Sequence, residues 1–386
     1  MPSELRVLVQ QLAAGRLLSE QGSYVFRYDP DVAAEQFVSF TMPVRKRDLV
    51  HNQLHPIFQM HLPEGYLLAL LKRHYSKLTT NDDFGLLRLM AQGIRGRIQY
   101  SNVVQAKPSL TLDELLQPKN DALFAELVER FALQSAVSGV QPKVLAQAVN
   151  KATLQLEHYI VKSWGDEYPE LALNEYWCMK VLQQAGVPVP EFYISDDAAL
   201  FVMRRFDITA SGGYLGFEDI AVLQARGREQ KYEGSYEQMV KTLNVFVSPQ
   251  HRANAMQQFF KMMVLNLALQ NGDAHLKNFG VLYTDIDNIW LAPAYDVIST
   301  TAYIRHDSMA LTLMDSRKWW QRKHVIQFGV QVCGLSSKQA NNLYDECEAA
   351  KKQVAKEVRQ ALTGLKKPEQ HEVLQHLLLL LERVDG

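Results

Sequence analysis

The hydrophobic pattern of this chain changes near residue 206. From about residue 131 to 206, short runs rich in β-branched and aromatic residues alternate with turn residues, and one segment of helical spacing interrupts them. Such short runs are typical of β-strands. After residue 206, apolar residues recur mostly every three or four positions, as in "RANAMQQFFKMMVLNLALQN" at 252–271, and this spacing indicates helices. The order predicts an α+β fold in which a β-rich lobe precedes a helical lobe.

The β-rich lobe is expected to hold a hairpin, a helix and two further strands. The helix should end at Gly186, because glycine readily takes the left-handed conformation that often follows a helix. The elements are predicted at 137–149 and 152–162, joined by a tight turn at Asn150-Lys151, then at 170–186, 187–195 and 198–207.

The N-terminal part of the chain predicts a small α+β subdomain. "YVFRYD" at 24–29 alternates apolar and polar residues, and "FVSFTMP" at 37–43 is rich in strand formers. "LPEGYLLALLKRHYS" at 62–76 begins like a helix, and Thr111 is expected to cap a short helix in the connector that follows. We predict three parts: an N-terminal subdomain at 1–106, a β-rich lobe at 107–206 and a helical lobe at 207–386.

Composition narrows the class of protein. The 386 residues are 47% hydrophobic, which suffices for a large core, and 41 Lys and Arg nearly balance 42 Asp and Glu. No overall charge therefore draws the chain to nucleic acid or to a membrane surface. Its 3 cysteines are scattered without a CxxC pair, which argues against a disulfide framework and a zinc site. Because the N-terminus lacks a signal peptide's apolar core and the leucine run at 377–381 is too short to span a membrane, we expect a cytoplasmic protein.

The segment "NGDAHLKN" at 271–278 is the most informative polar cluster. Asp273 precedes Asn278 by five residues. Protein kinases use this spacing in their catalytic loop, where the Asp accepts the proton of the substrate hydroxyl and the Asn binds magnesium. His275 lies where many kinases carry a charged residue near the transferred phosphate. A short loop would fix the separation of these groups.

A second acidic residue follows at the position such a site needs. "IWLAPAYDVIS" at 289–299 places Asp296 after an apolar run, eighteen residues beyond Asn278. Asp296 would then have the role of the Asp in the kinase DFG motif, although Val297 and Ile298 replace the Phe and the Gly. One carboxylate and one amide oxygen, completed by phosphate oxygens and water, suit magnesium.

The upstream segments supply a cation and its partner. Lys162 ends a predicted strand, and Glu175 is the lone carboxylate on the apolar stripe of the following helix. This pair corresponds to the ion pair with which kinases set their phosphate-binding Lys. The segment "VSGVQPK" at 137–143 is expected to cover the phosphates, though it holds a single glycine. The stripe consists of Ala172, Glu175, Met179 and Leu182.

Each of these residues alone has a simpler interpretation. "NGD" is a common turn sequence, Lys162 fits a surface position at a strand end, Glu175 a solvated or capping carboxylate, and Asp296 a turn former. Separate turns rarely imitate the whole series in this order along a β-then-α chain. The joint pattern therefore indicates a kinase-like site.

Together these segments resemble the HipA toxin family of bacterial type II toxin-antitoxin systems, whose members are serine/threonine kinases of a divergent two-lobed kinase-like fold. The resemblance covers nearly the whole chain. "GSYVFRYD", "FTMP" and "LPEG" are similar to the small subdomain that precedes the kinase core in full-length members. In the core the resemblance rests on "SGVQPKV", "YIVK", "NEYWCMKVLQQAGVPVP", "VMRRFD", "NGDAHLKNFGVLY" and "LAPAYDVIST", in the family's order.

The resemblance implies roles for individual residues. Asp273 would be the catalytic Asp in a loop completed by His275 and Lys277, and Asn278 with Asp296 would hold Mg2+. The implied ATP-binding residues are Lys162 with Glu175, the backbone near Arg204 to Phe206, Tyr295, and in the phosphate loop Ser138, Gly139, Val140, Gln141 and Lys143.

Two positions depart from the family pattern. Ala136 stands where members often carry the loop Ser that is autophosphorylated, so Ser138, with Ser135 behind it, is the predicted autophosphorylation site. A phosphate there would add negative charge to a loop meant for ATP phosphates, but Ser138 also fits a plain turn hydroxyl. The second departure is Val222, which replaces the usual Gln after Glu-Asp.

The function that follows is a growth-arresting protein kinase. By resemblance, its substrate would be a translation component such as an aminoacyl-tRNA synthetase, and a helix-turn-helix antitoxin would neutralise it and bind DNA in its place. Two alternatives stay open: a small-molecule phosphotransferase, and a pseudokinase that serves as a binding module for an antitoxin.

Overall fold

The computed structural model of the chain describes most residues of the two lobes. The described residues are 3–20, 22–62, 82–91, 94–100, 111–118, 123, 127, 151–155, 158–164, 167–365 and 367–383. The helix predicted at 62–76, the strand predicted at 137–149 and the phosphate-loop residues from Ser135 to Lys143 lie outside them, apart from Leu62.

A five-stranded antiparallel sheet forms the N-terminal part, with strand order β4-β3-β2-β1-β5. One face of this sheet is buried because Leu5, Val7, Leu17 and Phe26 point into a common core. The prediction at 24–29 is confirmed as β3. The strands are β1 Ser3–Val9, β2 Leu12–Glu20, β3 Ser23–Tyr28, β4 Leu49–His51 and β5 Ile98–Tyr100, accompanied by α1 Pro56–Gln59 and α3 Asp83–Met90.

The strand predicted at 37–43 is wrong. That segment makes one isolated bridge, between Ser39 and Met42. Its backbone N–H groups donate to side chains instead of to a neighbouring strand: Val38 to the Tyr28 hydroxyl at 2.8 Å, and Phe40 to the Glu218 carboxylate at 3.0 Å. Side-chain acceptors therefore replace the ladder that a strand would need.

A four-stranded antiparallel sheet, ordered β6-β7-β9-β8, forms the β-rich lobe. The single strand predicted at 152–162 is instead two strands that pair with each other, from Lys151 opposite Trp164 to Gln155 opposite Ile160. The polar pair Glu157-His158 interrupts the apolar run between them. The strands are β6 Lys151–Gln155, β7 Tyr159–Trp164, β8 Phe192–Ile194 and β9 Phe201–Arg204.

The helical lobe contains a three-stranded antiparallel sheet in the order β10-β11-β12. Helices predicted at 170–186 and 252–271 are confirmed as α7 and α10, and Gly186 has the expected positive φ of 70°. Thr111 caps α4 through a capping box with Glu114. The elements are α4 Leu112–Leu116, α7 Leu171–Gln184, β10 Gly216–Asp219, α8 Ile220–Leu223, α9 Tyr236–Phe246, α10 Pro249–Ala268, β11 Gly280–Tyr283, β12 Ile289–Leu291, α11 Arg322–Gln331, α12 Ser337–Leu362 and α13 Pro368–Glu382. Short 3-10 helices occur at Ala34–Gln36, Arg228–Gln230, Leu276–Asn278 and Thr300–Ala302.

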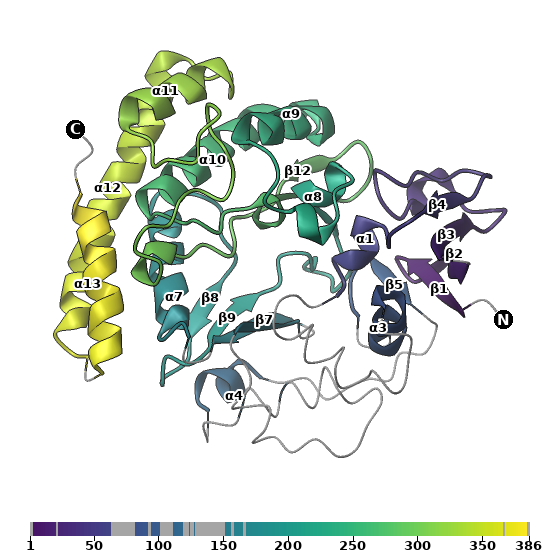
Figure 1. Ribbon diagram of the computed structural model, residues 1–386, viewed down its shortest axis with the longest axis horizontal. Helices are drawn as coiled ribbons and strands as arrows, with labels where there is room; N and C mark the ends of the chain where they lie inside the picture. Colours follow the sequence, from purple (N-terminus) through teal and green to yellow (C-terminus); the bar gives the residue numbers. More distant parts are fainter. Residues whose placement is uncertain are drawn as a thin grey trace.

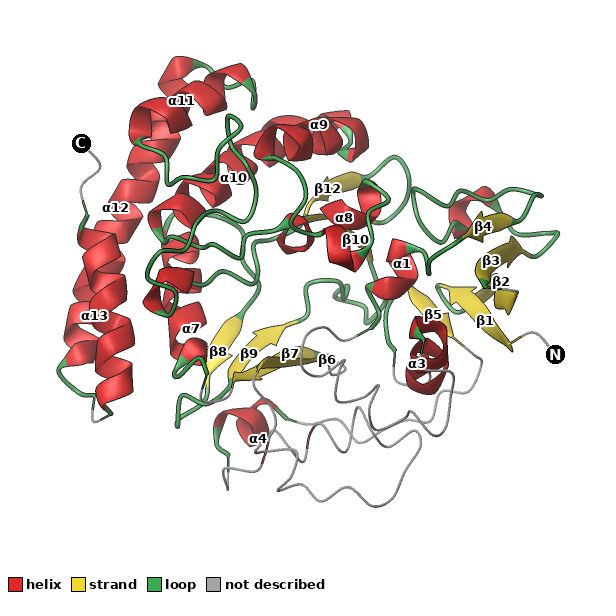
Figure 2. Ribbon diagram, in the orientation of Figure 1, coloured by secondary structure: helices red, strands yellow, loops and turns green. Residues whose placement is uncertain are grey.

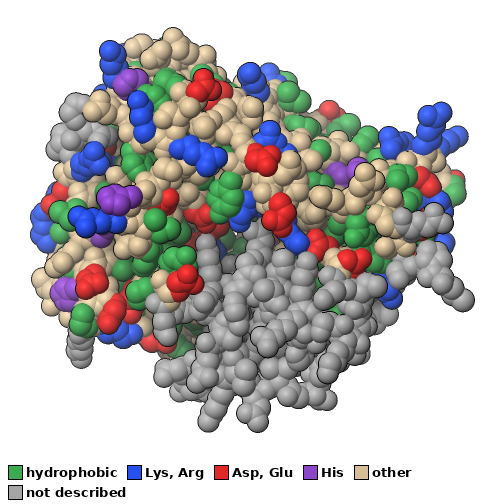
Figure 3. All heavy atoms as spheres, viewed as in Figure 1, with side chains coloured by type: hydrophobic (Ala, Val, Ile, Leu, Met, Phe, Trp, Pro, Cys, Tyr) green, Lys and Arg blue, Asp and Glu red, His purple; other side chains and the backbone are tan. Residues whose placement is uncertain are grey.

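Most of the labelled helices lie away from the N-terminal sheet. Figure 1 shows α12 and α13 side by side at one end, α7 packed against them and the strands β8 and β9, and the N-terminal sheet at the other end. Figure 2 shows most helices gathered on the side opposite that sheet. On the face drawn in Figure 3, acidic and basic side chains are interspersed among the coloured residues, in line with the balanced charge. Within the described ranges, no helix is both long and apolar enough to cross a bilayer.

The three cysteines, Cys178, Cys333 and Cys347, are free and buried. Burial raises the pKa of the Cys333 and Cys347 thiols to about 12. These side chains therefore behave as small apolar groups, not as nucleophiles.

The N-terminal sheet is joined to the rest of the chain in two ways. Its core also takes in Val161 and Val202 from the four-stranded sheet. Beside it, fully buried Glu218 on β10 accepts hydrogen bonds from the Ser39 hydroxyl at 2.8 Å and from Tyr283 on β11 at 3.0 Å. Arg97 lies over the Tyr283 ring, 5.1 Å from its centroid. Burial raises the pKa of Glu218 to about 7, although these hydrogen bonds act in the opposite direction.

Candidate functional site

Lys162 on β7 lies at the centre of a cluster of charged side chains. Its Nζ atom is 2.7 Å from Glu175 Oε1 and 2.7 Å from Asp296 Oδ1. The Lys162 side chain is buried, 7% exposed. Burial alone would lower the pKa of this ammonium, but the two carboxylates outweigh it and raise the pKa above its ordinary value. Lys162 therefore carries a fixed positive charge in a site sheltered from water.

Helix α7 presents Glu175 to this cluster because the carboxylate lies on the buried stripe of the helix. Ala172, Glu175, Met179 and Leu182 are all buried, and Glu175 is 0% exposed. The neighbouring Asn174 ties α7 to the segment after Asp296: its side chain accepts from the Ser299 N–H at 2.8 Å and donates to the Ser299 carbonyl at 3.0 Å. The helix therefore positions both partners of Lys162.

Asp296 has a strained backbone and an accessible side chain. Its φ of 58° lies in the left-handed region, which costs free energy for a residue other than glycine. Oδ1 meets Lys162, and Oδ2 accepts a hydrogen bond from Asn278 Nδ2 at 2.7 Å. The side chain is 31% exposed. Asp296 thus brings together the strand Lys and the loop Asn, which are far apart in the sequence.

The loop from 271 to 278 is held by hydrogen bonds along its length. The Asn271 side chain accepts from the Asp273 N–H at 3.1 Å, and Asn278 Oδ1 accepts from the His275 N–H at 2.9 Å. The Gly272 N–H donates to the Thr300 hydroxyl at 2.8 Å. A Cβ atom on Gly272 would clash with the Asp307 side chain and would lie 2.7 Å from the Ser308 carbonyl oxygen, so close packing demands glycine here. The loop is a turn, and its bonds also fix Asp273 and Asn278 relative to each other.

The remaining predicted residues of this loop differ in exposure and contact. His275 is buried, and its ring meets the Tyr232 ring edge-on at 5.1 Å. Lys277 is half-buried, and its carbonyl accepts a hydrogen bond from the Tyr295 hydroxyl at 2.7 Å. The Tyr232 hydroxyl donates to Asp273 Oδ1 at 2.6 Å.

Aromatic rings flank the loop on the side of the β-rich lobe. Phe206 and Tyr295 stack with centroids 5.3 Å apart, and Phe217 meets both rings edge-on. Such a group offers a flat apolar surface of the kind that a nucleotide base packs against.

The Arg204 side chain forms an exposed ion pair and not a contact with the three aromatic rings. The guanidinium is exposed and 3.1 Å from Glu191, while the Arg204 backbone N–H donates to the Glu191 carbonyl. The Arg205 N–H donates to the His158 carbonyl. A backbone contribution to a base from Arg204 or Arg205 would therefore use the carbonyl oxygens of this segment.

The donor set fits a hard divalent cation. Asp296 and Asn278 offer oxygen ligands, and Asn278 Oδ1, which accepts one hydrogen bond from His275, has a second lone pair. Within the described residues, no cluster of three or more His, Cys, Asp and Glu side chains could hold a metal by itself. A magnesium ion held here would therefore take further ligands from phosphate oxygens and water, as it does in kinases.

Comparison with known families identifies the chain. The model of the HipA-like C-terminal domain matches residues 135–354, more than half of the sequence, and the model of the HipA N-terminal domain matches residues 5–101. The chain belongs to the HipA family. The resemblance inferred from the sequence is therefore confirmed.

Curated relatives of this HipA-family chain carry kinase names. "Putative kinase Y4dM" of Sinorhizobium fredii is 28% identical over 287 residues, which are 68% of this chain and 66% of that protein. A "Putative kinase" of Haemophilus influenzae is 29% identical over 188 residues, which are 44% of this chain and 53% of that protein. The chain thus spans less than two thirds of the length of these two relatives.

A solved HipA structure shares the fold. It comes from the complex of HipA, HipB and operator DNA of the Shewanella oneidensis MR-1 toxin-antitoxin system. The TM-score is 0.73 at 19% sequence identity, and the match covers 98% of this chain and 96% of that chain. The predicted fold class, an α+β kinase-like fold, is confirmed by this match.

Several residues of the HipA-family site carry no sequence signal that identifies them. Tyr232 contacts Asp273 across 41 residues of sequence, and Thr300 contacts Gly272 across 28 residues. Phe217 joins the aromatic group from β10. Asn174 had a usable signal, since it directly precedes Glu175 on the same helix.

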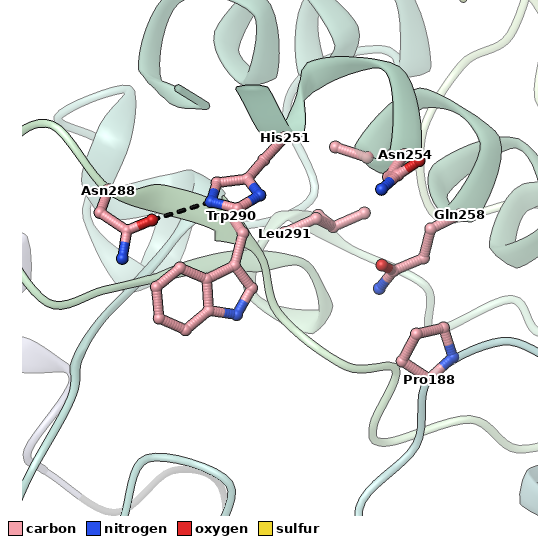
Figure 4. A pocket seen from close by; sticks show the side chains of 8 residues that line it. Pro188, His251, Asn254, Gln258, Asn288, Trp290 and Leu291 are labelled. Atoms are coloured by element: carbon pink, nitrogen blue, oxygen red, sulfur yellow. Dashed lines mark hydrogen bonds between the residues drawn. The ribbon is translucent and has the colours of Figure 1, made fainter. Parts of the chain in front are cut away.

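A cavity of about 460 Å³ lies elsewhere, between the N-terminal half of α10 and β12 (Figure 4). Trp290 and His251 face it, and His251 Nε2 is 2.8 Å from Asn288 Oδ1. None of its lining residues belongs to the group around Asp296. This cavity has no part in the site described above.

Proposed function

We propose that this chain is an ATP- and Mg2+-dependent kinase that phosphorylates serine or threonine residues of a protein. The observation that carries the proposal is the position of Lys162, whose ammonium bridges Glu175 and Asp296 while Asp296 also meets Asn278. A buried Lys–Glu pair beside an Asp and an Asn is the arrangement with which kinases hold ATP phosphates and their metal.

Each residue has a chemical task in this proposal. The Lys162 ammonium has three N–H groups, and the two contacts to carboxylates leave one for a phosphate oxygen. Asp296 and Asn278 would hold Mg2+, which when bound offsets the negative charge of the phosphates. Asp273 accepts the proton of the acceptor hydroxyl. Phe206 and Tyr295 would pack against the adenine.

The phosphate loop completes the proposal without structural support, because it lies outside the described residues. Ser138, Gly139, Val140, Gln141 and Lys143 would cover the phosphates, and Ser138 would be the autophosphorylation site. Phosphopeptide mapping of protein incubated with ATP tests this, and finding phosphate only at other residues would remove Ser138 from the proposal.

The partners are proposed from the family and from its solved member. The Shewanella chain of the same fold is described in complex with HipB and operator DNA. We therefore propose a helix-turn-helix antitoxin as the neutralising partner, with DNA reached only through it. The proposed substrate is a translation component such as an aminoacyl-tRNA synthetase, whose phosphorylation would arrest growth.

The test measures phosphate transfer from labelled ATP by the purified protein. Asp273→Asn should lower the rate of transfer about 10²- to 10⁴-fold, because it removes the proton acceptor. Asp296→Asn should abolish transfer, because it removes a metal ligand. Asp315→Asn is the matched control, since Asp315 is exposed and has the same φ of 58° as Asp296. Wild-type rates of phosphate transfer in both site variants would contradict the kinase proposal and favour a binding module.

Adding a cell lysate to the same reaction separates the remaining alternative. A protein kinase labels protein bands other than itself, and identification of the band names the substrate. Label that appears only in small molecules would instead indicate a small-molecule phosphotransferase.

A further inference from the structure

Tyr232 makes a contact that the proposed roles do not use. Its hydroxyl donates a hydrogen bond of 2.6 Å to Asp273 Oδ1. The residue lies in the loop before α9 and is 41% exposed. A tyrosine exposed to this extent adds little to the core, so its contact with Asp273 is the feature that needs an explanation.

The position of Tyr232 is set by its surroundings on two sides. The Tyr232 carbonyl accepts a hydrogen bond from Arg317 at 2.9 Å, and the carbonyl of the preceding Lys231 accepts from the Leu276 N–H at 3.1 Å. The ring meets the His275 ring edge-on at 5.1 Å. Leu276 and His275 belong to the same loop as Asp273, so the phenol is held in register with the carboxylate it contacts.

The hydrogen bond from Tyr232 involves only part of the Asp273 carboxylate. An ionised carboxylate has about four lone-pair sites on its two oxygens, and the phenol uses one of them on Oδ1. The hydroxyl of Tyr232 donates its one proton to Oδ1. This hydrogen bond restricts rotation of the Asp273 carboxylate about the Cβ–Cγ bond. An acceptor hydroxyl needs a carboxylate held in one orientation at hydrogen-bond distance.

We propose that Tyr232 is a positioning residue, whose hydroxyl holds the Asp273 carboxylate in the orientation that receives the acceptor's proton. The inference rests on the kinase proposal and adds a residue to it. Two other roles are conceivable for the Tyr232 hydroxyl. It could itself accept the phosphate, or it could inhibit transfer by blocking the position of the substrate hydroxyl. The three roles predict different kinetics.

Tyr232→Phe tests the proposal because it removes the hydroxyl and keeps the ring against His275. We expect kcat for phosphate transfer to fall about tenfold to a hundredfold, with KM for ATP unchanged, since misorientation of a catalytic group costs on that order. Tyr214→Phe is the matched control: Tyr214 is half-buried and forms an isolated bridge with Ile208, and the Arg205 guanidinium lies 5.5 Å from its ring. Loss of the Tyr214 hydroxyl should leave kcat at the wild-type value.

A double variant shows through which residue Tyr232 acts. Because the phenol works only through Asp273, Tyr232→Phe should cause no further loss in the Asp273→Asn background. An independent, additive loss would overturn the proposal, as would unchanged or faster turnover in Tyr232→Phe, or phosphate found on Tyr232 itself. A wild-type protein that transfers no phosphate overturns the kinase proposal first, whereas an active wild type with an equally active Tyr232→Phe overturns only this inference.

Discussion

Asp296 and Glu218 are carboxylates with several partners, but their surroundings differ. Asp296 meets the Lys162 ammonium, has a left-handed backbone and is 31% exposed. Glu218 is 0% exposed and lies in a regular strand, where its hydrogen-bond donors are the neutral groups of Ser39, Phe40 and Tyr283.

The difference distinguishes a candidate functional residue, Asp296, from a structural residue, Glu218, that connects two parts of the chain. At Asp296 the carboxylate contacts an ammonium, the backbone is strained, and part of the side chain is exposed to a ligand. Backbone strain of this kind is concentrated at functional sites. At Glu218 burial favours the neutral acid, and the partners come from two parts of the chain that it joins. In our proposal Asp296 takes part in phosphate transfer, whereas Glu218 connects the N-terminal sheet to β10 and β11.

Among the variants that test this comparison, Lys162→Met should have the largest effect. Without the ammonium, fully buried Glu175 has lost its cation, and breaking a buried pair by removing one partner costs about 3–5 kcal/mol. We expect the free energy of unfolding in urea to fall by that amount and phosphate transfer to fall about a hundredfold or more.

The double variant Lys162→Met with Glu175→Leu is the control for Lys162→Met. Replacing both ions by apolar side chains of similar volume is often neutral for stability, so the double variant should regain stability without regaining activity. A single variant as stable as the wild type would show that the ion pair contributes nothing to the fold.

The sequence predicted two parts of this cluster from local patterns. Helical periodicity placed Glu175 on a buried stripe, and short loops fixed the spacing from Asp273 to Asn278. The contact of Asp296 with Lys162 spans 134 residues, and its prediction came from the order of the motifs along the chain.

The sequence could not predict contacts without a period or a spacing rule. Tyr232 reaches Asp273 from 41 residues away, and Ser39 reaches Glu218 from 179 residues away. The hairpin between β1 and β2 turns at Gln10 and Gln11, both with positive φ, where Asn-Gly would have given a clear signal. Tertiary contacts, not local preference, determine these features.

The pH dependence of folding tests the other side of the contrast. Because the pKa of Glu218 is raised from 4.5 to about 7, the folded state keeps a proton that the unfolded chain releases near 4.5. The contribution of Glu218 protonation to the free energy of unfolding is therefore complete below pH 4.5 and is lost as the pH rises through about 7. Its loss should lower the free energy of unfolding by on the order of 3 kcal/mol.

Glu218→Gln isolates this effect from other titrating groups. The amide can keep the hydrogen bonds without ionising: its oxygen can accept from Phe40 and Tyr283, and its NH2 group can donate to Ser39. We expect the difference in unfolding midpoint between wild type and Glu218→Gln to change between about pH 5 and about pH 8. A difference that is constant with pH would contradict a raised pKa at Glu218.

The smallest expected effect is that of Ser39→Ala, which removes one donor to Glu218 Oε2. Loss of a buried hydrogen bond costs about 1 kcal/mol. The Ser39 bond lowers the Glu218 pKa, so its loss should raise that pKa and move the pH transition upward. Thr284→Ala is the matched control, because its hydroxyl makes a bond of the same 2.8 Å length to Asp285 but is exposed. If both variants unfold at the wild-type midpoint at about pH 8, the contact between Ser39 and Glu218 does not stabilise the attachment of the N-terminal part, contrary to what the burial of Glu218 indicates.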